Sequence, residues 1–283
     1  MKRILLPTDF SDNALNAIKY ALYLFEKEDC VFYLLNAYQV SPSPLSSKIN
    51  QERHTRLFEI TEEESIYKMK KLRTALENKN LSSNHRIKTY CKPGNLVQII
   101  FHFTTSKKID YIFMGTKGST AAKEIFMGSS TVAVIKNIDY CSVVAVPGKY
   151  VYDLPDEILF ATDFKRYFEK AEIKPLKDIA LLWNTTLRIL HINMGTLNTA
   201  QKKNKFILEQ LLVGIPFIEE ELLNHKGSIA KAIMKYANQK YIGMVAMVNN
   251  KHSFIEKQLR EAVVKKVAFK TDVPFLVLPE IQE

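Results

Sequence analysis

Three of the chain's nine glycines lie within one short stretch, residues 114–131, which reads MGTKGSTAAKEIFMGSST. They follow the pattern G-x2-G-x9-G-S, from Gly115 through Gly118 to Gly128. Glycine lets the backbone take a positive φ, and it has no side chain to keep a ligand at a distance. A single glycine would suffice to turn the chain. The cluster therefore favours a loop that wraps a ligand over a loop that only changes direction.

Hydroxyl side chains follow the last of these glycines. Ser129, Ser130 and Thr131 come directly after Gly128, where the start of a helix is expected. The first N–H groups of a helix have no intrahelical partner, and together with the helix dipole they favour an anion. Hydroxyl groups at the same place can donate to phosphate oxygens. The stretch therefore predicts the phosphate-binding part of a site.

A carboxylate after the first apolar run forms a second candidate. The sequence PTDF, residues 7–10, contains Thr8 and Asp9 where the first strand is expected to end. In open α/β sheets, ligands bind beyond the carboxyl ends of the strands, where the connections change direction. Asp9 would repel phosphate, so its expected partners are the hydroxyl or amino groups of a nucleoside. The alternative is that Asp9 caps the helix that follows.

The segments that must position these residues alternate between short apolar runs and amphipathic stretches. The first stretch has apolar residues at helical spacing, and Ser11 is a suitable N-cap for it. The short runs are apolar throughout, which is typical of strands buried on both faces of a parallel sheet. Strict alternation of this kind predicts a doubly wound α/β fold. The expected strands are 3–7, 31–38, 85–91, 111–115 and 142–147, and the expected helices are 11–28, 52–79, 94–107 and 124–138.

The same order of elements then repeats. The sequence EILFATDF at 157–164 parallels RILLPTDF at 3–10, and VPFLVLP at 273–279 parallels the apolar run that closes the first half. Counted back from Pro147 and Pro279, the two halves keep the same register over a long stretch. We interpret the chain as an internal duplication.

Two domains follow from this duplication, residues 1–149 and 150–283, with the boundary near the sequence GKYVYDLPDE. The second copy is shorter than the first. It lacks an equivalent of the Ser- and Pro-rich loop at 41–49 and of much of the long second helix.

The second copy serves as an internal comparison for the glycine cluster. Its matching segment, residues 247–266, contains no glycine. Counting back from the prolines places Arg260 where Gly128 stands and Glu261 where Ser129 stands. A carboxylate at that helix start would repel phosphate. We infer that the fold does not need the glycines and that the second domain does not bind a nucleotide, although it keeps the sequence ATDF.

Composition narrows the classes of function. A net charge of +10 and a pI near 9.3 are compatible with a polyanionic partner. The basic residues are scattered, and the clusters at 201–205 and 257–266 are expected to be solvated helix faces, so nucleic-acid binding is not expected. No apolar run approaches the roughly 18 residues of a transmembrane helix, and the N-terminal apolar run is too short for a signal peptide. We expect a cytoplasmic protein without membrane contacts.

The sequence lacks the motifs of several common kinds of catalytic, metal-binding and disulfide-bonded protein. Cys30, Cys91 and Cys141 form no C-x-x-C pair, which argues against a disulfide framework or zinc site and for reduced thiols in or near the core. The sequence contains no P-loop, dinucleotide fingerprint, nucleophile elbow or H-E-x-x-H motif. Glu124 is the one acid within the glycine motif. We expect no catalytic and no metal-ligating residues.

With PTDF, the apolar second strand and G-x2-G-x9-G-S in place, the chain resembles the universal stress protein family in its tandem, two-domain form. The resemblance implies five-stranded parallel sheets of order 3-2-1-4-5. It also implies that the two fifth strands pair within the chain and make an internal pseudo-dimer. Members with the full glycine motif typically bind ATP, with or without Mg²⁺. Carried over residue by residue, the implied site comprises Pro7, Thr8, Asp9, Ala37, Met114, Gly115, Thr116, Gly118, Gly128, Ser129, Ser130 and Thr131.

Three classes of function remain open. The leading hypothesis is a regulatory or stress-response protein that binds ATP in its first domain. The second is an enzyme that slowly hydrolyses ATP or transfers its adenylyl group. The third is a nucleotide-free scaffold whose basic surface binds a protein partner. The sequence does not identify that partner, nor does it define assembly beyond the internal pseudo-dimer.

Overall fold

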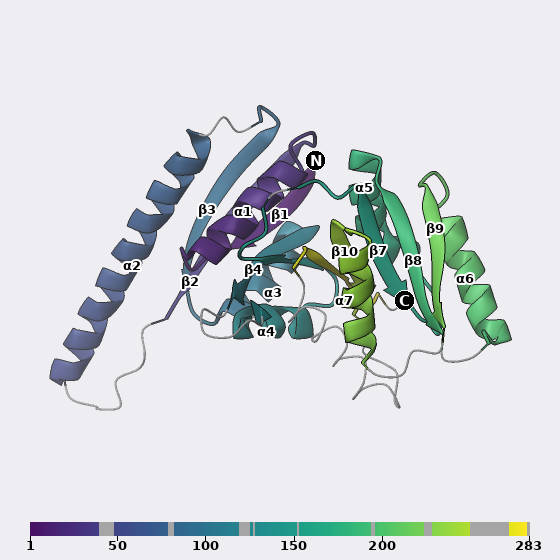
Figure 1. The fold of residues 1–283 in the computed structure, drawn as a ribbon. Coiled ribbons are helices and arrows are strands. Elements are labelled where there is room, and N and C mark those ends of the chain that lie inside the picture. The colour runs from purple at the N-terminus through teal and green to yellow at the C-terminus, as the bar shows by residue number, and fades with distance from the viewer. Residues whose placement is uncertain are drawn as a thin grey trace.

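The fold is known from a computed structural model (Figure 1). It describes residues 1–39, 48–78, 82–118, 125–126, 128–151, 153–193, 196–223, 228–249 and 272–281. The first half of the chain contains β1 (Lys2–Pro7), α1 (Asp12–Leu24), β2 (Cys30–Tyr38), α2 (Lys48–Glu77), β3 (His85–Pro93), α3 (Leu96–Lys107), β4 (Tyr111–Gly118), β5 (Ile125–Phe126), α4 (Ser129–Asn137) and β6 (Ser142–Pro147). The second half contains β7 (Glu157–Thr162), α5 (Lys170–Trp183), β8 (Thr186–Asn193), α6 (Thr199–Leu211), β9 (Phe217–Leu223), α7 (Ile229–Gln239), β10 (Met244–Val248) and β11 (Phe275–Leu278).

One continuous sheet runs through the molecule in the order β3-β2-β1-β4-β6-β11-β10-β7-β8-β9 (Figure 1). Within each half, the neighbouring strands of this order are parallel. In the first half β6 is the fifth strand, so the expected order 3-2-1-4-5 is confirmed, and the second half repeats it. The halves meet where β6 and β11 pair antiparallel, with Leu276 opposite Val144. The expected internal pseudo-dimer is therefore confirmed.

Apolar side chains of the strands alternate between two buried layers. On one face, α1, α2, α5 and α6 cover the sheet, and on the other face α3, α4 and α7 cover it. In β1, for example, Ile4 and Leu6 point into the first layer and Leu5 into the second. All three are fully buried. Burial on both faces explains why the strands are apolar at every position.

Two local expectations need correction around the fourth helix. α4 begins at Ser129, after the expected start near residue 124. Ile125 and Phe126 form the short strand β5, which pairs antiparallel with the end of β4 at Lys117 and Gly118. β4 accordingly continues to Gly118, past its expected end at residue 115. Backbone pairing between β4 and β5 takes the place of the helical bonds that the periodicity favoured.

The register between the two halves is also corrected. Ile4 lies opposite Tyr111 in the first half, and the corresponding pair in the second half is Ile158 and Met244. Counting back from the closing prolines predicts Gly243 at this place instead. The second half therefore has one residue fewer between its fourth and fifth strands, and the assumption of a common register is wrong. The expected shortening of its second helix is confirmed, since α6 has 13 residues and α2 has 30.

Candidate functional site

The loop after β1 is a tight, hydrogen-bonded turn. The Thr8 hydroxyl accepts a hydrogen bond from the backbone N–H of Phe10 at 2.9 Å, and Phe10 has a φ of +64°. The Asp9 carboxylate is exposed, and its Oδ1 accepts from the backbone N–H of Ser11 at 3.0 Å. Ser11, not Asp9, caps α1, because its hydroxyl accepts from the N–H of Ala14 at 3.3 Å. The capping role considered for Asp9 is therefore wrong.

A buried amide that the sequence reading overlooked holds this loop in place. The Asn36 side chain donates to the carbonyl of Thr8 at 2.7 Å, and its oxygen accepts from the hydroxyl of Ser65 on α2 at 2.7 Å. Asn36, Thr8 and Ser65 are all buried. Asn36 interrupts an otherwise apolar strand, VFYLLNAY, and that interruption is the signal that could have identified it.

The neighbouring residues complete this end of β2. Ala37 is partly exposed beside Asn36, at the place where the family resemblance puts the base. The Tyr38 hydroxyl donates to Glu62 of α2 at 2.8 Å. Burial and this bond raise the pKa of Tyr38 to about 12. Two side chains of α2 therefore fix the strand end on which the candidate site depends.

Gly115 is required by close packing. A Cβ atom there would overlap the backbone carbonyl of Asn13, in the first turn of α1. Neither Gly115 nor Gly128 has a positive φ, so the expected conformational reason for these two glycines is wrong. Gly115 instead lets the start of α1 approach the end of β4. This is a structural role, and it operates whether or not a ligand is bound.

The start of α4 is held against the end of β4. The Thr131 hydroxyl is buried and donates to the carbonyl of Gly115 at 3.1 Å. Gly128 is the N-cap residue, with φ −61° and ψ 148°, and it has no side chain with which to cap the helix. Ser129 and Ser130 are exposed. The first turn of α4 therefore presents backbone N–H groups and two hydroxyls at the end of β4.

The sheet brings these parts to one edge. β1 and β4 are parallel neighbours, and extending their register to the carboxyl ends places Thr8 level with Gly115. The remaining expected residues are distributed as follows: Pro7 ends β1, Gly118 ends β4, and Met114 and Thr116 are buried. Residues 119–124 and 127 of the glycine motif lie outside the described residues. The arrangement suits an anion at α4 and a polar group of the same ligand near Asp9.

The first half of the chain matches a known protein family. A family model described as the universal stress protein family matches residues 1–147. The chain belongs to the universal stress protein family. The universal stress protein MJ0531 of Methanocaldococcus jannaschii is 32% identical over 145 residues, which is 51% of this chain and 81% of the relative.

Solved universal stress proteins share the fold over the whole chain. One from Archaeoglobus fulgidus DSM 4304 has a TM-score of 0.66 with 19% identity, covering 98% of each chain. A putative universal stress protein from Pseudomonas aeruginosa has a TM-score of 0.60 with 13% identity, covering 99% of this chain and 93% of the other. These likenesses show the fold and, by their extent, its tandem arrangement.

The second half repeats the loop of this universal stress protein without repeating the glycines. Phe164 has a φ of +55°, and its N–H donates to the Thr162 hydroxyl at 3.2 Å. His191 takes the place of Asn36, with its Nδ1 3.2 Å from the carbonyl of Thr162. His191 is buried. Residues 250–271, including Arg260 and Glu261, lie outside the described residues.

The strand pairing changes which residue of the second half corresponds to Gly115. Its counterpart in the second half is Val248, by the register of β7 with β10. A side chain fits there because α5 begins only at Lys170, well after Asp163, whereas α1 begins directly after the corresponding loop. The later helix start leaves room for Val248. In the second half, a valine at this position goes together with a later start of the helix.

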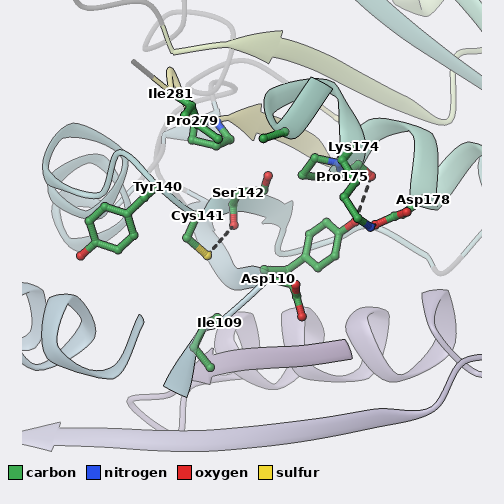
Figure 2. Close-up of a pocket in the computed structure, with 12 residues that line it drawn as sticks. Ile109, Asp110, Tyr140, Cys141, Ser142, Lys174, Pro175, Asp178, Pro279 and Ile281 are labelled. Atoms are coloured by element: carbon green, nitrogen blue, oxygen red, sulfur yellow. Dashed lines mark hydrogen bonds and ion pairs between the residues drawn. The ribbon is translucent and has the colours of Figure 1, made fainter. Parts of the chain in front are cut away.

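A separate pocket of about 140 Å³ lies at the opposite edge of the sheet, where the amino ends of β4 and β6 meet α5 (Figure 2). Tyr111 donates to the carbonyl of Pro175 at 2.9 Å, and Lys174 pairs with Asp178 at 2.6 Å. The Ser142 hydroxyl is buried and has no hydrogen-bond partner in the part of the chain that the structure describes. This pocket joins the two halves and contains none of the expected site residues.

Among the described residues, no group of three or more His, Cys, Asp or Glu side chains could hold a metal ion. Cys30 and Cys141 are buried and Cys91 is partly buried, and all three are free thiols, as expected. None of the described helices combines the length and apolar character that a membrane span requires.

Proposed function

We propose that the first domain, residues 1–149, binds an adenine nucleotide, ATP, at the carboxyl edge of β1 and β4. The single observation that carries this proposal is the placement of the open first turn of α4 beside the loop of Thr8 and Asp9. Phosphates would accept from the N–H groups of the first turn and from Ser129 and Ser130. Asp9, exposed on the other side, would accept from ribose hydroxyls.

The residues of the proposed site have different tasks. Gly128, Ser129 and Ser130 would contact the phosphates, and Ala37 would lie near the base. Thr131 and Gly115 would act indirectly, because they fix α4 and α1 against β4. Mg²⁺, where present, would be held mainly by the phosphates, since the described residues contain no group of ligands for it. The second domain is proposed to bind no nucleotide.

Thermal unfolding with ATP tests this proposal. A ligand at about 100 times its Kd stabilises the native state by about 2.7 kcal/mol, which raises Tm by roughly 5–10 °C for a chain of this size. Gly128→Glu should abolish the shift, because its carboxylate would occupy the phosphate position. Lys203→Ala makes the same change in net charge on the exposed face of α6 and should keep the shift. An unchanged Tm of the wild type with millimolar ATP would refute nucleotide binding.

Two further measurements separate the proposed binder from the other classes. Mass spectrometry of the denatured protein would reveal ATP or AMP carried through purification. Phosphate release under turnover conditions would distinguish a slow hydrolase from a protein that only binds. A scaffold without nucleotide would show neither a bound nucleotide nor a thermal shift.

A further inference from the structure

The pocket of about 140 Å³ at the meeting of the two halves is the right size for a small ligand (Figure 2). The first half of the chain contributes the amino ends of β4 and β6, with Tyr111 and Ser142. The second half contributes the amino-terminal half of α5 and the segment that contains Pro279. A cavity of about 150 Å³ can hold a benzene ring. The pocket is therefore large enough for a small molecule with one ring.

The hydroxyl of Ser142 gives this pocket a polar group that needs a partner. Ser142 is 1% exposed, and within the ranges that the structure describes its hydroxyl makes no hydrogen bond. Side chains alternate along a strand, so Ser142 lies on the same face of β6 as Val144, which is the face that α5 covers. Buried hydroxyl groups are nearly always hydrogen-bonded, because an unpaired one costs free energy. A ligand in the pocket could supply the missing partner.

The charged side chains around the pocket are already engaged. Asp110, Lys174 and Asp178 line it, and Lys2 pairs with Asp178 from outside the lining. Lys174 also pairs with Asp178, at 2.6 Å. The Asp110 carboxylate accepts from the backbone N–H of Arg3 at 2.8 Å. With Lys2 included, the charges of these lysines and aspartates balance, so the pocket favours an uncharged ligand.

The pseudo-twofold axis between β6 and β11 relates this pocket to a second place at the junction of the halves. By the register of the strands, Asp110 corresponds to Gly243, and Pro279 corresponds to Pro147. At the second place α1, which follows β1, stands where α5, which follows β7, stands beside the pocket. The two places therefore have equivalent backbone surroundings.

A phenol ring occupies the second place. The backbone N–H of Tyr150, in the segment that joins the halves, donates to the carbonyl of Pro147 at 3.0 Å. The Tyr150 ring packs edge-on against Tyr20 of α1, with the ring centroids 5.4 Å apart. Its hydroxyl lies 3.5 Å from the carbonyl oxygen of Gly243. The equivalent surroundings at the pocket should accept the same chemical group, with Ser142 as the partner of its hydroxyl.

We propose that the pocket binds a small, uncharged phenol, which contacts both halves of the chain at once. Its ring lies between α5 and the segment at Pro279, and its hydroxyl bonds with the hydroxyl of Ser142. p-Cresol, which is the tyrosine side chain without its backbone, has the required size and chemistry. The pocket shares no residue with the site proposed for ATP, so either proposal can fail without the other.

Calorimetric titration of the full chain with p-cresol tests the proposal. The wild type should bind p-cresol in the millimolar range or tighter. Ser142→Ala should weaken this binding about 2- to 10-fold, which is the effect of one neutral hydrogen bond. Toluene lacks the hydroxyl and should bind the wild type more weakly than p-cresol does, and Ser142→Ala should not weaken toluene further. Ala171→Leu should abolish binding of both, because the larger side chain fills the pocket from α5.

A matched control removes a hydroxyl elsewhere. Ser106→Ala, on the exposed face of α3, should bind p-cresol as the wild type does. Both pocket variants should unfold cooperatively, as the wild type does, which separates loss of binding from loss of the fold.

Three results would overturn the proposal. They are a wild type that does not bind millimolar p-cresol, an Ala171→Leu variant that binds it as the wild type does, and equal binding of p-cresol and toluene. N-acetyltyrosinamide distinguishes a free phenol from a tyrosine of a peptide. Tighter binding of this probe than of p-cresol would also overturn the assignment to a small molecule.

Discussion

Val144 and Leu276 lie directly opposite each other where β6 and β11 run antiparallel. This pair is the centre of the internal symmetry, because the two strands meet here at equivalent positions of the two halves. Both side chains are fully buried. The fifth strand of each half, which would otherwise be an exposed apolar edge and an invitation to aggregate, is paired inside the chain.

Cysteines at this pair should form a disulfide within one chain. Directly opposed residues of antiparallel strands have Cα atoms about 4.5–5.5 Å apart, within the range that a disulfide spans. With Cys91 replaced by Ser, Val144→Cys and Leu276→Cys should link under mild oxidation, as peptide mapping would show. Val143→Cys with Leu276→Cys is the control, because adjacent residues of a strand point to opposite faces. Equal crosslinking of both variants would contradict the assigned register.

Gly115→Ala should destabilise the protein whether or not nucleotide is present. The added methyl group would meet the backbone of Asn13, and overpacking of this kind costs about 1–3 kcal/mol. Urea unfolding without ligand measures this loss as a lower midpoint at unchanged slope. Gly128→Ala is the comparison, since Gly128 has an ordinary φ of −61° and should unfold close to the wild type. A stable Gly115→Ala protein would show that the close approach of α1 is not a constraint.

Asn36→Leu should cost about 1–3 kcal/mol of unfolding free energy, because the Thr8 carbonyl and the Ser65 hydroxyl would lose their buried partner. Asn36→His should recover part of this loss, since His191 makes the corresponding contact with Thr162 in the second half. Hydrogen exchange of the Phe10 and Ser11 amides gives a local readout. Faster exchange in Asn36→Leu than in Asn36→His is expected, and equal exchange would argue against a role for Asn36 in holding the loop.

Stability should fall as the pH rises from about 9 to about 12. Burial raises the pKa of Cys30 from 9.0 to about 12, and burial raises those of Tyr38 and Tyr150 from 10.0 to about 12. In this range the unfolded chain has already lost protons that the folded chain retains, so deprotonation favours unfolding. Urea titrations at several pH values would measure the slope. Cys30→Ala should make it shallower, whereas Cys91→Ser serves as the control; a slope that Cys30→Ala leaves unchanged would contradict the raised pKa of Cys30.

Much of the fold could be read from the sequence because the strands are buried on both faces and the helices carry clear amphipathic patterns. Ser11 as a cap followed from local chemistry, and the pairing of the two fifth strands followed from the resemblance to the universal stress protein family. Other features depend on contacts that local patterns do not encode. Ser65 meets Asn36 only once α2 has packed on the sheet. The need for Gly115 arises from the approach of α1, and the short strand β5 arises from pairing with the end of β4.

The candidate site was predictable to a similar degree. Sequence patterns predicted that Asp9 and Gly128 lie at the same edge of the sheet. The parallel pairing of β1 with β4 is consistent with this prediction, because it brings the carboxyl ends of the two strands together. They did not indicate that Thr131 is committed to the Gly115 carbonyl, because that bond joins two ends of the motif across the loop. Counting back from Pro147 and Pro279 without a gap gave the wrong register between the two halves. The reason is that the second half has one residue fewer between its last two strands.

The antiparallel join of β6 with β11 has a genetic consequence. In a homodimer of single-domain chains, every substitution appears in both subunits, so a change that suits one side of the interface must also be tolerated on the other. Here the two sides are encoded separately, and a substitution enters only one of them. The partner strand is also supplied at a fixed ratio of one to one, independent of protein concentration. The sequence of one half can therefore diverge while the other half keeps the original pattern. Val248 and the later start of α5 are examples of such divergence in the second half.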